Sequence, residues 1–150
     1  MDMATATRTQ LNTAELEQKV KEMYGEVARN PHGKFHFEMG RVLAERLGYP
    51  SADLDRIPAG GVDSFAGVGH YFDLAKLQPG ETVVDLGSGS SMDTFIAALY
   101  VGKTGKVVGV DMTDAQLDKA ERLRAAAGFE NVSYLKSYIE AVRCEDGAFD

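Results

Sequence analysis

The chain has 150 residues, enough for one domain with a sizeable core, and its 44% hydrophobic and 26% charged residues are ordinary proportions for a globular protein. Sixteen Lys and Arg residues stand against 23 Asp and Glu residues, which gives a formal net charge of −7, and no segment gathers basic residues on one face. This balance argues against a nucleic acid or an anionic membrane as the partner.

Cysteine content and hydropathy indicate the compartment. The single cysteine, Cys144, excludes an intramolecular disulfide and suits a reducing environment. No apolar run approaches the roughly 18 residues that a membrane-spanning helix needs. Residues 1–12 are polar, so we expect a disordered tail there rather than a signal peptide. Together these features predict a cytoplasmic protein.

Two amphipathic helices are expected before the first strand. Apolar residues recur at helical spacing over residues 13–29, with Thr13 as the N-cap, and again over residues 35–47. Helices with one apolar face need a surface to cover, so we expect residues 13–57 to form a helical cap on one end of the core. A lid or a substrate wall is the alternative role for this cap.

A glycine-rich stretch follows a short helical turn at residues 51–58. Residues 58–72 contain four glycines and end in two aromatic residues, which predicts a loop with bends and aromatic anchors. The loop is either a plain connector or a segment that folds over a ligand cleft. A short helix at residues 73–77 and a Gln-Pro-Gly turn then lead into the first strand.

The most informative stretch is VVDLGSGSS, residues 83–91. The apolar residues at 82–86 predict a buried parallel strand with helices on both faces, and the glycines after it predict a tight turn that faces a ligand. Gly87 and Gly89 allow the backbone to approach that ligand because they carry no Cβ. A helix predicted over residues 92–101 would direct its free N–H groups at the same molecule.

Two features separate the cofactor classes that use such a turn. A dinucleotide fingerprint has a third glycine three positions after the second, and Met92 occupies that position here. Asp85 lies two residues before Gly87, where its carboxylate would repel a pyrophosphate and favour a cationic or zwitterionic ligand. A nicotinamide-dependent oxidoreductase domain, which Asp111 would also suit, is therefore the alternative and not the leading interpretation.

Asp111 ends a second predicted strand, residues 106–111, which leads into a helix predicted over residues 114–127. Ligands of doubly wound sheets bind at the carboxyl ends of the strands, so an acid at this place is positioned to accept hydrogen bonds from ribose hydroxyls. Its alternative role is to cap the helix that follows. The position and the motif together favour the ribose role.

A third strand is predicted over residues 132–137, with Ile139 and Glu140 at its carboxyl end. Glu140 is placed to accept a hydrogen bond from an adenine amino group while Ile139 covers the ring; a surface Glu and a core Ile are the alternative. The fold class is thus α/β, a Rossmann-like doubly wound parallel sheet within residues 58–150, truncated after the third strand and preceded by N-terminal helices.

Three stretches resemble the class I S-adenosylmethionine-dependent methyltransferases, and more narrowly the arsenite methyltransferase branch. They are VVDLGSGSS, GKVVGVDMT (residues 105–113) and NVSYLKSYIE (residues 131–140), with YGEVA at residues 24–28 as a weaker similarity. The resemblance implies an enzyme with S-adenosylmethionine as cofactor. It implies a cofactor site made of Asp85, Gly87, Ser88 and Gly89 at the methionine part, Asp111 and Met112 at the ribose and one adenine face, and Ile139 and Glu140 at the adenine edge.

The implied reaction is direct transfer of the sulfonium methyl group to a small-molecule nucleophile, with the protein supplying proximity and orientation. We identify no catalytic residue and expect no metal site. The arsenite enzymes of the family hold arsenic with several cysteines, and Cys144 alone cannot do so; the acceptor is therefore not predicted. Ser91 stands where the family has its last glycine, and its side chain is expected to narrow the cofactor cleft or alter the helix start.

The resemblance also implies a seven-stranded sheet in the order 3-2-1-4-5-7-6, of which this chain encodes the first three strands. The first strand would then lie at an open edge, which is a template for pairing with another chain. We expect either a fragment of a longer enzyme or a homodimer that pairs through residues 82–86. A catalytically inactive interaction module is the remaining alternative.

Overall fold

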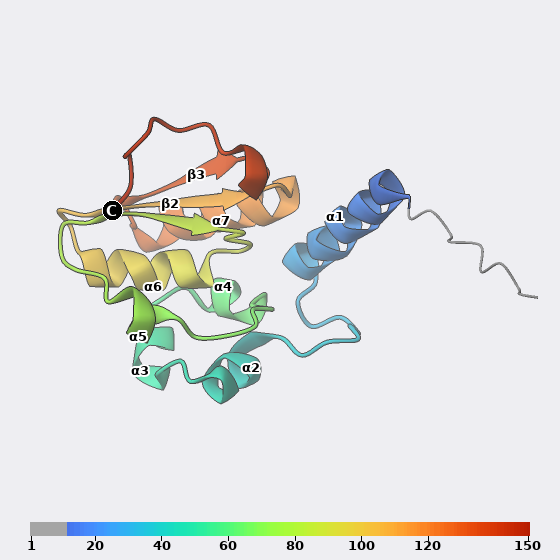
Figure 1. The fold of residues 1–150 in the computed structure, drawn as a ribbon. Coiled ribbons are helices and arrows are strands. Elements are labelled where there is room, and N and C mark those ends of the chain that lie inside the picture. Colours follow the sequence, from blue (N-terminus) through green and yellow to red (C-terminus); the bar gives the residue numbers. More distant parts are fainter. Residues whose placement is uncertain (1–11) are drawn as a thin grey trace, which may run out of the picture.

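A computed structural model describes residues 12–150 of the chain (Figure 1). The predicted tail at residues 1–12 lies outside the described residues except for Asn12. The elements, in chain order, are α1 (Thr13–Arg29), α2 (Gly40–Leu47), α3 (Ser51–Leu54), α4 (Ala59–Asp63), α5 (Phe72–Ala75), β1 (Thr82–Leu86), α6 (Met92–Val101), β2 (Lys106–Asp111), α7 (Asp114–Ala127), β3 (Val132–Lys136) and the 3-10 helix η1 (Ile139–Ala141).

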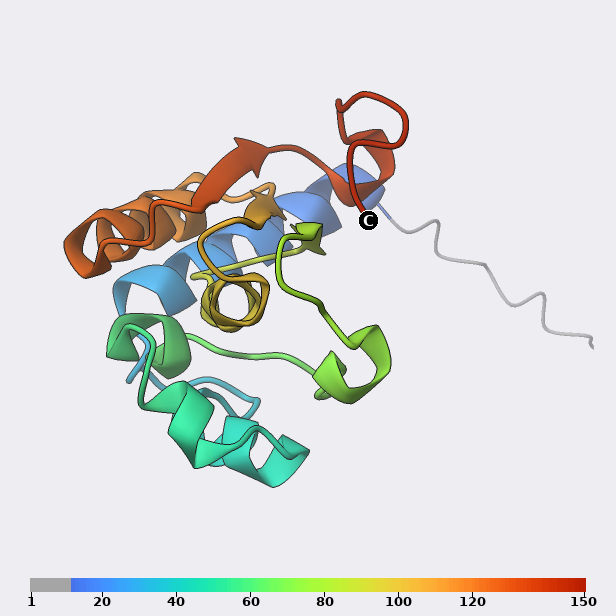
Figure 2. The same cartoon turned by 90° about the vertical axis from the view of Figure 1, so that its left-hand side faces the viewer.

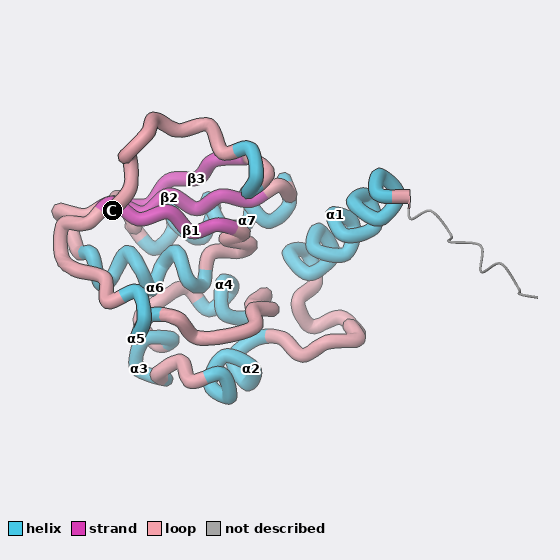
Figure 3. Tube along the Cα trace, in the orientation of Figure 1, coloured by secondary structure: helices cyan, strands magenta, loops and turns pink. Residues whose placement is uncertain are grey.

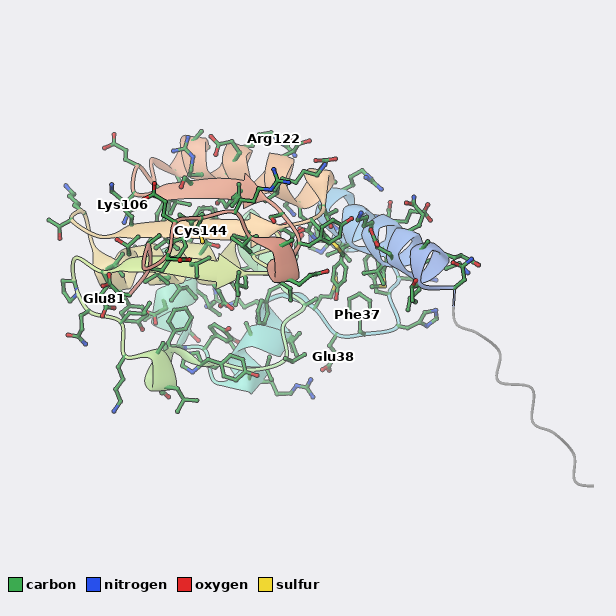
Figure 4. The ribbon with its side chains drawn as sticks, turned by 45° about the horizontal axis from the view of Figure 1, so that its top comes forward. Phe37, Glu38, Glu81, Lys106, Arg122 and Cys144 are labelled. Atoms are coloured by element: carbon green, nitrogen blue, oxygen red, sulfur yellow. The ribbon has the colours of Figure 1, made fainter. Side chains whose placement is uncertain are left out.

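The three strands form a parallel sheet in the order β1-β2-β3. Val83 of β1 lies opposite Val107 of β2, which in turn lies opposite Val132 of β3. Figure 3 shows the strands side by side, with the loops at their carboxyl ends directed toward α1. In Figure 4, Glu81 and Lys106 lie at the opposite end of the sheet. The Rossmann-like α/β prediction is confirmed.

Helix α6 connects β1 to β2, and helix α7 connects β2 to β3. Because such connections are right-handed and the strands follow one another in order, both helices pack on the same face of the sheet. Figure 2 shows α6 end-on between the sheet and α2–α5. Among the described residues, no connecting helix covers the other face, and the segment after β3 arches past it (Figures 1 and 4). The prediction that β1 is buried on both faces is therefore wrong: Val83 and Val84 are half-buried and Leu86 is 52% exposed.

One hydrophobic core joins the sheet to the N-terminal helices. Phe95 and Val101 of α6 are fully buried and belong to the same cluster as Val107 of β2 and Leu43 of α2. Tyr49, which follows α2, is 3% exposed in this cluster. The division into a helical cap at residues 13–57 and a sheet domain from residue 58 stays a prediction. Within residues 12–150 no helix combines the length and the apolar character that crossing a membrane requires.

Two helix starts differ from their predictions. The N-cap of α1 is Asn12, whose side-chain oxygen accepts the Glu15 N–H, one residue before the predicted Thr13. The second helix begins at Gly40 instead of residue 35. Gly40 has a φ of 77°, which breaks a helix that would run in from residue 35, and its N–H donates to the carbonyl oxygen of Phe65.

The predicted loop at residues 58–72 begins as a helix, α4. Its glycines serve close packing rather than bending. A Cβ on Gly60 would lie 3.1 Å from the Leu123 Cδ2 atom, and a Cβ on Gly61 would lie 3.1 Å from the carbonyl oxygen of Ser90. Glycine composition alone does not distinguish a bend from a contact of this kind, and the helix was missed for that reason.

The outer edge of β1 has a partner at its first residue. The Asp150 N–H donates to the Thr82 carbonyl oxygen at 2.9 Å, and the Thr82 N–H donates to the Asp150 carboxylate at 2.7 Å. In the sheet itself β1 pairs with β2 alone. Thr82 is thus paired on its outer side by the last residue of the sequence.

A truncation of the core strand β2 tests the packing. Val107→Ala removes two methyl groups from a side chain that is 0% exposed, and we expect the free energy of unfolding to fall by about 2 kcal/mol. The matched control is Val68→Ala, at a side chain that is 86% exposed. This substitution should change the free energy of unfolding by less than about 0.5 kcal/mol. Urea unfolding followed by circular dichroism measures both; equal effects would contradict this account of the core.

Candidate cofactor site

A cavity of about 540 Å³ lies at the carboxyl ends of the three strands. Its walls come from the turn after β1, the first turn of α6, the ends of β2 and β3, the segment 61–67 and α1. All eight predicted cofactor residues line it: Asp85, Gly87, Ser88, Gly89, Asp111, Met112, Ile139 and Glu140. The volume is within the usual range for small-molecule sites.

The turn after β1 presents bare backbone to this cavity. Gly87 and Gly89 have φ values of 77° and 52°, in the left-handed region that glycine adopts without strain. The N–H groups of Gly87 and Ser88 donate to the Val110 carbonyl oxygen at 2.8 and 2.9 Å, which fixes the turn against β2. A Cβ on Gly87 would meet no atom within 4 Å, so the space beside it is open.

Asp111 ties the turn to the end of β2. One carboxylate oxygen accepts the Gly89 N–H at 3.0 Å and the other accepts the Thr113 N–H at 2.8 Å. The hydrogen bond from the Thr113 N–H lies beside the start of α7 and agrees with the alternative role, in which Asp111 caps this helix. Each oxygen can accept a further hydrogen bond, so this bracing role is compatible with the ribose role.

Ser91 stands where the resembling family has its last glycine, and its side chain points away from the turn to a hydrogen-bond partner in β3. It has a φ of 79°, a left-handed conformation that strains a residue with a Cβ, and it is fully buried. Its hydroxyl donates to the Tyr134 hydroxyl of β3 at 2.7 Å. The side chain is therefore directed at β3, where its hydrogen bond offsets part of the backbone strain. Helix α6 still begins at Met92.

Among residues 12–150, Ser88 carries the one buried side-chain oxygen or nitrogen atom without a hydrogen-bond partner. Its Oγ is buried and has no hydrogen-bond partner among residues 12–150. Buried polar atoms are normally paired, and this one lies against β2, 2.9 Å from the place that a Cβ on Gly109 would take.

Two buried carboxyl groups lie at the end of the cavity near α6. Burial raises the pKa of Asp85, and the charge of Asp111 acts in the same direction, while a hydrogen bond from the Thr94 hydroxyl at 2.6 Å opposes both. Burial raises the pKa of Asp93 to about 7; the Tyr49 hydroxyl, which donates to it at 2.7 Å, lowers this pKa, and the charge of Asp85 raises it. Asp93 was not predicted as a site residue.

Helix α1 forms the wall at the other end, through Glu17 and Tyr24. The buried Gln116 of α7 holds it there: its side-chain amide donates to the Tyr24 carbonyl oxygen at 2.9 Å, and its amide oxygen accepts from the Ser90 hydroxyl. The Tyr138 hydroxyl donates to the Glu17 carboxylate at 2.6 Å. Gln116 was not predicted as a site residue.

The two remaining walls complete the site. Gly61, Ser64 and Phe65 belong to the glycine-rich stretch and line the cavity, which favours the cleft-covering role over a plain connector. Ile139 lies in η1 at the far side and is 60% exposed, so it is not the core residue of the alternative interpretation. Glu140 is exposed beside it.

A metal centre has no counterpart in this region. Across residues 12–150, no group of three or more His, Cys, Asp and Glu side chains is arranged to hold an ion. Cys144 is exposed and free.

Comparison with known proteins assigns the sheet region. Residues 77–150 match the model of a family described as a methyltransferase domain. This part of the chain is similar to the methyltransferase domain family. The predicted family resemblance is thereby confirmed, together with the fold.

Named relatives narrow the comparison. The chain is 45% identical over 91 residues to an arsenite methyltransferase of Halobacterium salinarum, covering 61% of this chain and 23% of the relative. It is 35% identical over 79 residues to a ubiquinone/menaquinone biosynthesis C-methyltransferase of Salmonella arizonae, covering 52% of this chain and 32% of the relative. The matched region thus spans less than a third of these relatives' length.

A solved structure shows the same fold. An arsenic(III) S-adenosylmethionine methyltransferase from Chlamydomonas reinhardtii superposes with a TM-score of 0.50 at 34% identity, covering 60% of this chain and 32% of that one. The methyltransferase domain described above therefore matches its relatives in sequence and in structure.

The raised pKa of Asp93 predicts how stability varies with pH. In the unfolded chain the carboxyl group loses its proton near pH 4, whereas in the folded chain it keeps the proton to about pH 7. Between these values the folded state binds more protons, so stability falls as the pH rises. Relative to Asp93→Asn, the wild-type free energy of unfolding should fall from pH 4 to pH 7 by up to about 1.4 kcal/mol per pH unit. Urea unfolding at several pH values measures this; a constant difference would contradict the burial of Asp93.

Proposed function

We propose that this methyltransferase domain binds S-adenosylmethionine in the cavity at the strand ends and takes part in methyl transfer to a small molecule. The observation that carries the proposal is the turn after β1, where Gly87 and Gly89 present bare backbone and Asp85 lies beside them. An acid at that place favours a positively charged nucleoside over a pyrophosphate. Relatives named as methyltransferases support the same conclusion.

The residues of the cavity suggest how the cofactor is held. Asp85 supplies negative charge for its methionine part, and the turn from Gly87 to Gly89 lies against the same part. Asp111 accepts from ribose hydroxyls with the lone pairs that its two backbone bonds leave free. Glu140 and Ile139 take the adenine edge at the exposed side.

When bound, the cofactor supplies a methyl group on a positively charged sulfur. The residues of this chain bind and orient it, and the walls from α1 and segment 61–67 exclude water. A soft nucleophile needs no general base. Relatives named for arsenite and for quinone biosynthesis suggest a small-molecule acceptor. Cys144 is the one cysteine of these 150 residues and it is exposed, so this part of the protein does not itself supply the multidentate thiolate binding that arsenite requires.

The two alternative functions are less well supported. A nicotinamide site would use a third glycine where the buried Met92 lies. An inactive interaction module does not account for the eight site residues around one cavity.

Binding calorimetry with one glycine variant tests the proposal. S-adenosylhomocysteine should give heat with the wild type and NADH should give none. Gly87→Ala places a Cβ in open space at the cavity wall, and we expect at least a 10-fold weaker affinity. The matched control is Gly128→Ala, with a φ of 73° and also no atom within 4 Å of its Cβ, which carries the same strain away from this cavity. Equal losses in both variants, or heat with NADH alone, would overturn the proposal.

We further propose that a second copy pairs along the outer edge of β1. Asp150 occupies only the first residue of this edge, Thr82, and the exposed Leu86 at its other end supports pairing beyond that residue. Light scattering over a range of concentrations should give a dimer mass, and Val84→Pro, which removes an N–H from β1, should reduce it. A monomer mass at every concentration would contradict the pairing.

The wider setting of the protein follows from its composition. We propose a cytoplasmic location, which suits one unpaired cysteine, and partners other than nucleic acid or membrane, which suits a net charge of −7.

A further inference from the structure

Asp93 lies in the cavity wall without a role in the site described so far. It is in the first turn of α6, eight residues after Asp85, and both side chains belong to the same end of the cavity. Its carboxylate accepts the Tyr49 hydroxyl at 2.7 Å, and this hydroxyl also lies 3.1 Å from the Gly69 carbonyl oxygen. A carboxyl group at a cavity wall, held by a buried tyrosine, is placed to act on a ligand.

Besides burial, two neighbouring groups act on the pKa of Asp93, and they are Tyr49 and Asp85. The hydrogen bond from Tyr49 lowers this pKa and the charge of Asp85 in β1 raises it, while the charge of Asp111 in β2 raises the pKa of Asp85. On the side of the N-terminal helices, the Tyr49 ring packs edge-on against the His70 imidazole at 4.7 Å, and Tyr71 lies near enough to influence Tyr49.

Two buried carboxyl groups so arranged resist carrying two negative charges at once. Asp93 therefore keeps its proton near neutral pH when the cavity holds no cation. A positive charge in the cavity reverses this balance, because it attracts both carboxylates in a poorly screened setting.

We propose that Asp93 makes the site prefer the positively charged cofactor over its neutral product by releasing its proton when the cofactor binds. This inference rests on the proposed function. S-adenosylmethionine and S-adenosylhomocysteine share their ammonium, carboxylate and nucleoside groups and differ by the sulfonium charge, so Asp93 distinguishes them through that charge. Transfer of the methyl group removes the sulfonium charge of the cofactor. Asp93 then takes up a proton from solvent, and the affinity of the site for S-adenosylhomocysteine falls. Tyr49 is the positioning residue, since its hydroxyl fixes the carboxyl group.

Calorimetry with both ligands between pH 6 and pH 8 tests the inference. In the wild type, the ratio of the affinity for S-adenosylmethionine to that for S-adenosylhomocysteine should rise about 5- to 10-fold over this range. Asp93→Asn keeps the shape of the side chain and the Tyr49 hydrogen bond but removes the ionisation, so the Asp93 contribution to this rise should disappear. The ligands' own titration is common to both proteins and cancels in the comparison.

Tyr49→Phe provides a second variant in case Asp93→Asn does not fold. The Tyr49 hydrogen bond stabilises the ionised carboxylate, so its loss should move the midpoint of the rise to higher pH, which a purely structural role would not do. The same pH dependence in the wild type and in Asp93→Asn, or an unmoved midpoint in Tyr49→Phe, overturns the inference while the proposed function stands. Absence of binding by both ligands to the wild type overturns both.

Discussion

The carboxylate of Asp111 is the constraint on which the site depends. Its two oxygens accept the N–H groups of Gly89 and Thr113, so one side chain fixes the turn after β1 relative to the start of α7. Hydrogen bonds from backbone N–H groups to an ionised acceptor are among the stronger ones in proteins. With the turn held in this way, Gly87 and Gly89 keep the positive φ values that leave backbone exposed to the cavity.

The N-terminal helices supply the walls of the cavity that the sheet does not form. Gln116 bridges α7, the turn and α1, and Tyr49 reaches from the far side of α6 to Asp93. Helix α4 approaches the turn closely because Gly61 has no side chain to keep it away from the Ser90 carbonyl oxygen. The walls of the cavity therefore come from segments distant in sequence, and they meet because they share one hydrophobic core.

The sequence predicted the α/β part well because its signals are local. Alternating strands, helices and glycine turns predicted β1, α6, β2, α7 and β3 to within one residue, and the motif placed the eight predicted residues around one cavity. Asp93, Tyr49 and Gln116 were missed because their roles come from burial and from long-range hydrogen bonds. The exposed face of β1 was missed for a related reason, since an apolar strand does not reveal how many of its faces are covered.

The two ends of the cavity differ in how water reaches their charges. At the α1 end, Glu17, Lys21 and Tyr138 form a cluster of polar contacts near the surface, where dissolved ions weaken attraction between charges. At the α6 end, Asp85 and Asp93 are buried, and ions in solution reach them poorly. The attraction between charges at the α1 end is therefore the more sensitive to ionic strength, whereas the pKa of about 7 makes Asp93 at the α6 end sensitive to pH.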